Sequence, residues 1–112
     1  MNLAISKDQV GQVLVVHVGG DLDVYTAPQL KEALAETLGS NGGTLVLDLS
    51  DVHFMDSTAL GVLSSSLQQA RSHAGDFRLV MDDPYLLKIF HITGFDGVFA
   101  IYPKVADALS AS

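Results

Sequence analysis

The feature that most constrains the fold is an alternation of strand-like and helix-like segments from Val13 to the end of the chain. Apolar, β-branched runs predict strands at residues 13–18, 44–49, 77–81 and 98–102. Short connections in such an alternation form right-handed parallel crossovers, so we expect helices packed against a mostly parallel sheet. An earlier strand at residues 3–6, joined through a polar turn near Gly11, adds an antiparallel edge. The predicted order is β-β-α-β-α-β-α-β-α, with four to five strands in a mixed α/β sheet.

The predicted helices are recognised by their first residues and by their leucine spacing. Thr26 and Gln29 have the spacing of a capping box, which predicts the start of the first helix. Leucines at helical spacing over residues 60–67 predict the second helix. Pro84 follows two aspartates, as at the first position of a helix, and residues 104–110 form the last one.

Two polar segments follow strands in this scheme and lead into helices. Gly19 and Gly20 are expected to end the second strand, so that GGDLDVYT at residues 19–26 forms a loop. SDVHFMDST at residues 50–58 follows the third strand in the same way. Because functional loops lie at the carboxyl ends of parallel strands, we expect these two segments to lie side by side and to form the functional site.

Three consecutive helix-start residues, Asp56, Ser57 and Thr58, occupy the end of the second segment. One cap needs only one such residue, so the other two side chains are available for another role. The first turn of a helix offers unpaired N–H groups and a partial positive charge, which attract an anion. A phosphoryl group on Ser57 would add roughly −1.5 to −2 charges there, and these N–H groups could hold it. The motif is therefore suited to a charge switch, although an ordinary cap is the simpler explanation for Ser57.

Composition excludes several classes of function. The 112 residues fit one domain, 1–112, and contain 13 acidic against 6 basic residues, a net charge of −7. Such a chain is not expected to bind nucleic acid or an anionic membrane. It has no cysteine, and its four histidines fall in different elements, so no disulfide and no metal site is expected. The N-terminal residues lack a long apolar run, which predicts a cytoplasmic location.

Three stretches resemble the STAS domain family, and specifically the bacterial anti-sigma factor antagonists. They are GDLDVYTAPQL (20–30), LVLDLSDVHFMDSTALGVL (45–63) and HITGFDGVFAIY (91–102). The resemblance implies that Ser57 is phosphorylated by a cognate anti-sigma factor that is also a serine kinase. In the unphosphorylated state, such a protein binds the anti-sigma factor and frees a sigma factor, and phosphorylation ends the binding. ATP and magnesium would belong to the partner, so this chain would need no cofactor, and a phosphatase that resets the serine is a further candidate partner.

The same resemblance indicates which residues surround the acceptor. Asp21 and Asp23 would lie close to Ser57. Apart from the resemblance, the apolar residues near the site, Phe54, Met55 and Val24, are either interface anchors that supply contact area or buried residues. The family usually has glycine where this chain has Ala59, so a methyl group is expected next to the acceptor. The surface expected to contact the partner comprises Asp21, Asp23, Val24, Tyr25, Phe54, Met55, Asp56, Thr58 and Ala59.

Other functions fit the sequence less well. A phosphoaspartate enzyme with the D-x-D-x-T pattern would need its hydroxyl one residue before Thr26, and a receiver domain would need a Lys-Pro step where this chain has Pro103-Lys104. A serine hydrolase would need a G-x-S-x-G elbow, which is absent around Ser57. We therefore expect a binding protein and not an enzyme. The alternative is a STAS interaction module of a lipid-transport or stress-signalling complex that acts without phosphorylation.

Overall fold

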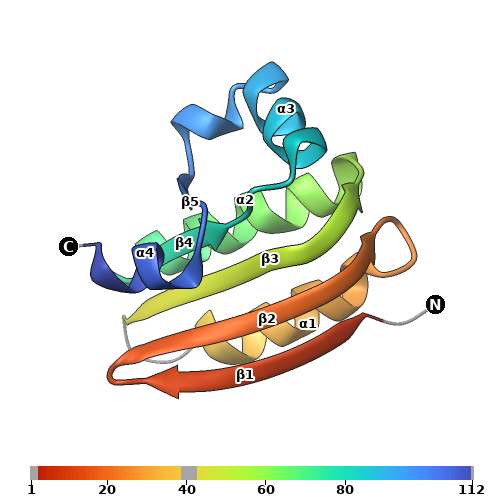
Figure 1. Cartoon of the computed structure of the whole chain (residues 1–112). Coiled ribbons are helices and arrows are strands. Elements are labelled where there is room, and N and C mark those ends of the chain that lie inside the picture. The colour runs from red at the N-terminus through yellow and green to blue at the C-terminus, as the bar shows by residue number, and fades with distance from the viewer. Residues whose placement is uncertain (1–2, 39–42, 112) are drawn as a thin grey trace.

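The computed structural model describes residues 3–38 and 43–111, which form one five-stranded sheet with helices on both faces (Figure 1). The strand order is β1-β2-β3-β4-β5, with β1 antiparallel to β2 and all other pairs parallel. The predicted mixed, mostly parallel sheet is therefore confirmed. The elements are β1 (Ala4–Val10), β2 (Val13–Leu22), α1 (Ala27–Leu38), β3 (Thr44–Met55), α2 (Ser57–Ser72), β4 (Asp76–Val80), α3 (Pro84–Ile92), the 3-10 helix η1 (Phe95–Gly97), β5 (Ala100–Tyr102) and α4 (Val105–Ser110).

Two hydrophobic clusters lie on opposite faces of the sheet. The larger one joins leucines of α1 and α2 and residues of α3 to inward residues of the strands, such as Val16 and Leu47. The smaller one joins Val15, Val46 and Val80 to Ala108 of α4. Neighbouring positions such as 15 and 16 serve different clusters because successive strand side chains point to opposite faces. Figure 1 accordingly shows α1 and α2 behind the sheet and α4 in front of it.

Aromatic packing attaches the C-terminal part of the chain to the sheet. Phe99 makes edge contacts with three other rings, at centroid distances of 6.4 Å to Phe77, 5.8 Å to Phe90 and 5.6 Å to Phe95. Phe95 lies in η1, an element that the sequence did not predict. These contacts keep α3 on the same side of the sheet as α2.

Four strands differ from their predicted lengths: β1, β2 and β3 are longer, and β5 begins at Ala100, two residues later than predicted. β2 continues beyond Gly19 to Leu22, and β3 continues to Met55, where we expected loops. The prediction was wrong because Gly19 and Gly20 do not end pairing: the β2–β3 register shifts on either side of Gly19, as at a β-bulge, and pairing then resumes. β1 likewise extends through charged residues to Val10, because it is an edge strand with one side open to solvent.

The expected start of α3 is confirmed. Pro84 occupies the first helical turn, and the Asp83 side chain accepts hydrogen bonds from the N–H groups of Tyr85 and Leu86. Gly94, with φ +77°, follows the helix in the left-handed conformation that glycine adopts without strain. Among the helices of the described ranges, none combines the length and the hydropathy needed to cross a membrane.

Candidate functional site

The carboxyl ends of β2 and β3 lie side by side, as the sequence predicted, although as paired strands and not as loops. Asp21 is opposite Phe54, and Leu22 is opposite Met55. The Asp56 N–H then donates to the Leu22 carbonyl oxygen at 3.0 Å. The start of α2 is thus fixed directly against the end of β2, which brings the two predicted segments into one surface.

Asp56 alone caps α2 among the three helix-start residues. Its backbone is extended, and one of its carboxylate oxygens accepts from the N–H groups of Thr58 at 3.0 Å and Ala59 at 3.2 Å. The side chains of Ser57 and Thr58 are exposed. Within residues 3–38 and 43–111, neither hydroxyl has a hydrogen-bond partner. The Ser57 hydroxyl is therefore accessible and has no structural task in this part of the chain.

Two residues expected at the contact surface are buried. Ala59 and Met55 both belong to the main hydrophobic cluster, and the Ala59 side chain is completely inaccessible to solvent. The expectation that the Ala59 methyl group occupies space next to the acceptor is wrong, because this methyl points into the core. Met55 likewise supports the surface from below and cannot add contact area to it.

The turn between β2 and α1 is built on Asp23 and Thr26. An Asp23 carboxylate oxygen accepts from the N–H groups of Tyr25 at 2.9 Å and Thr26 at 3.0 Å. The Thr26 hydroxyl accepts from the Asp23 N–H and donates to the Asp21 carbonyl oxygen at 2.7 Å. Thr26, predicted as a helix cap, thus uses its hydroxyl to close the turn. Asp23 is a structural residue of this turn.

The closed turn presents two large side chains to solvent. Val24 is 56% exposed and Tyr25 is 81% exposed. Both were expected at the contact surface. Their backbone is held by the hydrogen bonds of Asp23 and Thr26, so their exposure is a property of an ordered turn.

The structure adds a neighbour that the sequence did not predict, the start of α3. The ring of Phe54 stacks on Tyr85, with 6.4 Å between centroids and 16° between planes. His53 Nδ1 lies 2.6 Å from a carboxylate oxygen of Asp83, which raises the pKa of His53, and Asp51 and Asp21 add to this rise. The same hydrogen bond lowers the pKa of Asp83. The sequence held no signal for this contact, because it depends on where α3 lies relative to β3.

Asp48, the polar residue within β3, has a structural role. One carboxylate oxygen accepts from the N–H and the hydroxyl of Ser50, and the other lies 2.7 Å from His17 Nδ1. His17 Nε2 lies 2.9 Å from Asp8. Hydrogen bonding to Asp48 raises the pKa of His17 against the opposing effect of burial. Burial acts to raise the pKa of Asp48, but the hydrogen bonds from Ser50 and His17 outweigh it and lower the pKa.

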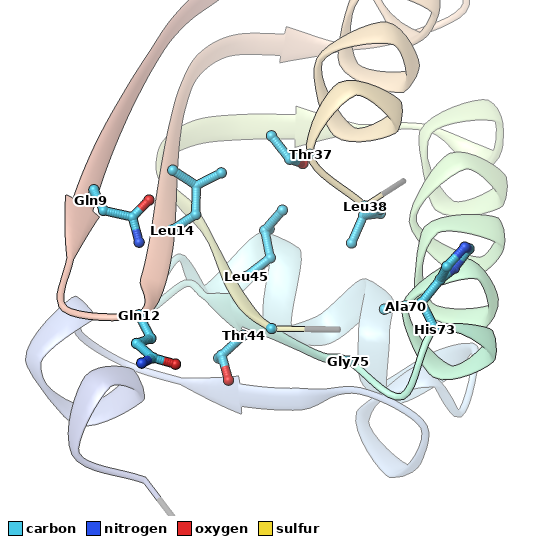
Figure 2. Close-up of a pocket in the computed structure, with 11 residues that line it drawn as sticks. Gln9, Gln12, Leu14, Thr37, Leu38, Thr44, Leu45, Ala70, His73 and Gly75 are labelled. Carbon is cyan, nitrogen blue, oxygen red and sulfur yellow. The ribbon is translucent and has the colours of Figure 1, made fainter. Parts of the chain in front are cut away.

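A cavity of about 250 Å³ lies far from Ser57, at the opposite end of α2 (Figure 2). It is bounded by the β1–β2 hairpin, the start of β3 and the last turns of α1 and α2, including Leu38 and His73. It shares no residue with the surface around Ser57. In the described ranges, no three histidine, aspartate or glutamate side chains come together in a way that could hold a metal ion.

Comparison with known proteins identifies the family. Residues 4–108 match the STAS domain. The chain is 34% identical to an anti-sigma-B factor antagonist of Bacillus subtilis over 93% of this chain and 94% of the relative. It is 32% identical to the anti-sigma-F factor antagonist RsfB of Mycobacterium tuberculosis, over 88% and 80%. The crystal structure of an anti-sigma factor antagonist from Mycobacterium paratuberculosis has a TM-score of 0.89 at 32% identity, covering 96% of this chain and 92% of the other. The chain therefore belongs to the STAS domain family.

Proposed function

We propose that this protein is an anti-sigma factor antagonist, which binds an anti-sigma factor and thereby frees a sigma factor. The relatives described above support this proposal, since those from Bacillus and Mycobacterium carry this name and align with most of the chain. The surface around Ser57, formed by the β2–α1 turn, the end of β3 and the start of α2, docks on the partner. The protein acts by binding in the cytoplasm and contributes no catalytic group.

The partner is a serine kinase that phosphorylates Ser57. In that step, Ser57 Oγ attacks the γ-phosphorus of ATP held with magnesium by the partner, the bond to ADP breaks, and a base of the partner takes the hydroxyl proton. The observation that carries this assignment is the exposed Ser57 hydroxyl, which has no partner in the described ranges, beside a helix that Asp56 already caps. Phosphorylation would therefore break no hydrogen bond of that side chain.

A phosphate on Ser57 would weaken docking by its charge. Asp56 already occupies the N–H groups of Thr58 and Ala59, so these groups are not free to neutralise the phosphate. The added charge, roughly −1.5 to −2, joins a surface that carries Asp21, Asp23 and Asp56. A coupling free energy of about 1–3 kcal/mol between two binding events changes affinity about 5- to 150-fold. The charge of the phosphate is therefore sufficient to exclude the partner directly, without a change of fold.

The test uses the kinase-type anti-sigma factors of the source genome, each purified and incubated with this protein and ATP. We expect phosphate on Ser57, mapped by mass spectrometry. Ser57→Ala should bind such a partner persistently and Ser57→Asp should bind weakly, while Thr58→Ala, the matched neighbouring variant, should still be phosphorylated and released. If both Ser57 variants bound as the wild type does, the switch would be excluded. Tight binding with no phosphate transfer would instead favour the STAS interaction module that acts without phosphorylation.

A further inference from the structure

Phe54 of β3 and Tyr85 of α3 form a stacked pair of aromatic rings that remains partly exposed to solvent. The rings are nearly parallel, with centroids 6.4 Å apart, yet Phe54 is 40% exposed and Tyr85 is 47% exposed. The pair lies outside the buried aromatic cluster around Phe90 and Phe99, and neither ring belongs to the main hydrophobic cluster. Exposed aromatic pairs of this kind are typical of protein interfaces.

The backbone of Tyr85 is held in place by the residues around it. Asp83 uses one carboxylate oxygen to cap α3, accepting from the Tyr85 N–H at 2.8 Å. Its other carboxylate oxygen is 2.6 Å from His53, the residue before Phe54. Leu86, the residue after Tyr85, is completely buried and anchors the first turn of α3 in the core. The pair is thus held in place before any partner arrives, which lowers the entropy lost on docking.

The pair is continuous with the proposed docking surface. Phe54 lies opposite Asp21 in the β2–β3 pairing, and two residues further along the chain Asp56 begins the turn into α2. The exposed Tyr25 side chain belongs to the turn that follows β2. The start of α3 therefore extends this surface beyond the β2–α1 turn and the start of α2.

Acidic side chains predominate in the segments that form this surface, and the exposed Lys88 lies one turn further along α3. Segments 21–25, 51–58 and 82–85 contain no lysine or arginine, and their one histidine, His53, is paired with Asp83. They contain six aspartates, Asp21, Asp23, Asp51, Asp56, Asp82 and Asp83. An aromatic pair surrounded by carboxylates fits a partner surface in which lysine and arginine side chains surround an apolar pocket.

We propose that the Phe54–Tyr85 pair is the aromatic anchor of the docking surface, and that it inserts into an apolar pocket with a basic rim on the anti-sigma factor. This inference rests on the proposed function and adds α3 to the interface. Tyr85 contributes through its ring, and His53 and Asp83 are positioning residues. Removal of an anchoring aromatic side chain should reduce affinity by at least about 10-fold.

The test measures the affinity of the unphosphorylated protein for each purified kinase-type anti-sigma factor by calorimetry. Tyr85→Ala should bind at least about 10-fold more weakly, while Tyr85→Phe, which keeps the ring, should bind like the wild type. Val10→Ala is the matched control, since Val10 is 46% exposed but is the last residue of β1, where it pairs with Val13 at the far end of β2. A rise in salt from about 50 to about 500 mM should weaken wild-type binding, as a basic partner requires.

The outcomes separate this inference from the proposed function. Wild-type binding with an unchanged affinity for Tyr85→Ala would overturn the aromatic anchor and leave the proposed function standing. Absence of binding by the wild type to any anti-sigma factor would overturn both. Thermal unfolding of each variant, expected to match the wild type, shows whether a loss of affinity comes from the missing ring or from a damaged fold.

Discussion

Asp56 and Ser57 are adjacent residues with different tasks, so substitution of each should change the stability of the protein by a different amount. Asp56→Ala removes the side-chain acceptor for the N–H groups of Thr58 and Ala59. Loss of such a cap should lower the free energy of unfolding by about 1 kcal/mol. Ser57→Ala, the matched control, should change it by less than about 0.5 kcal/mol, because the side chain is exposed. Urea unfolding of both variants measures the difference, and equal losses would mean that Ser57 shares the capping.

Single residues show how much of the site the sequence predicts. Three helix-start residues in a row indicated that two side chains are available for a role other than capping, and the structure shows the side chain of Ser57 exposed. Which residue caps could not be predicted, because aspartate, serine and threonine have similar preferences for that position. Thr26 was assigned to a helix cap from its spacing to Gln29; it does directly precede α1, but its hydroxyl bonds within the β2–α1 turn. The preference of a residue predicts that it lies at the start of a helix, whereas the geometry of the neighbouring strand determines which groups its side chain bonds to.

The elements themselves were largely predictable, and their ends and contacts were not. The order of strands and helices follows from apolar periodicity, which each segment carries on its own. The continuation of β2 through Gly19 and Gly20 depends on pairing with β3, a contact made with residues more than thirty positions away in the chain. The stacking of Phe54 on Tyr85 requires the position of α3, which the Phe99 cluster sets. Such long-range contacts have no local sequence pattern.

The packing of helix α2 can be tested by substitution of its small residues. Ala59→Gly should lower the free energy of unfolding by about 1–2 kcal/mol, because it removes a buried methyl group and a good helix former. Gly61→Ala, on the same helix, is the matched control. Apart from the neighbouring residues and backbone of the helix itself, no heavy atom lies within 4 Å of the added methyl, so this change should raise stability by about 0.5–1 kcal/mol.

Phosphorylation of the same variants by the anti-sigma factor tests where the Ala59 methyl points. Because this methyl lies in the core, Ala59→Gly should accept phosphate on Ser57 at the wild-type rate. Radiolabel incorporation over time measures that rate. A markedly faster reaction of the glycine variant would indicate that the methyl does reach the kinase.

The stability of the whole protein should depend on pH through a link of side-chain contacts that joins three strands. His17 of β2 contacts Asp8 of β1 and Asp48 of β3, on the sheet face that carries α4. The pKa of His17 is raised in the folded state, so its contribution to stability is complete below the ordinary value of 6.5 and is lost as pH rises through the folded pKa. The pKa of Asp48 is lowered, so its contribution is present above the ordinary value of 3.8 and is lost as pH falls through the folded pKa. Both contributions are therefore present together between these two values.

It follows that the free energy of unfolding should fall as pH rises from about 6 to about 9, because His17 loses its charge while still facing two carboxylates. Urea unfolding across this range measures the decline. His17→Gln should flatten the profile, and the slope that remains should come from His53, whose pKa is raised by Asp83 in the same direction. His73→Gln, at the end of α2, is the matched control for removal of a histidine outside this link. If His17→Gln declined as steeply as the wild type, the link between the three strands would contribute nothing to the pH response of the fold.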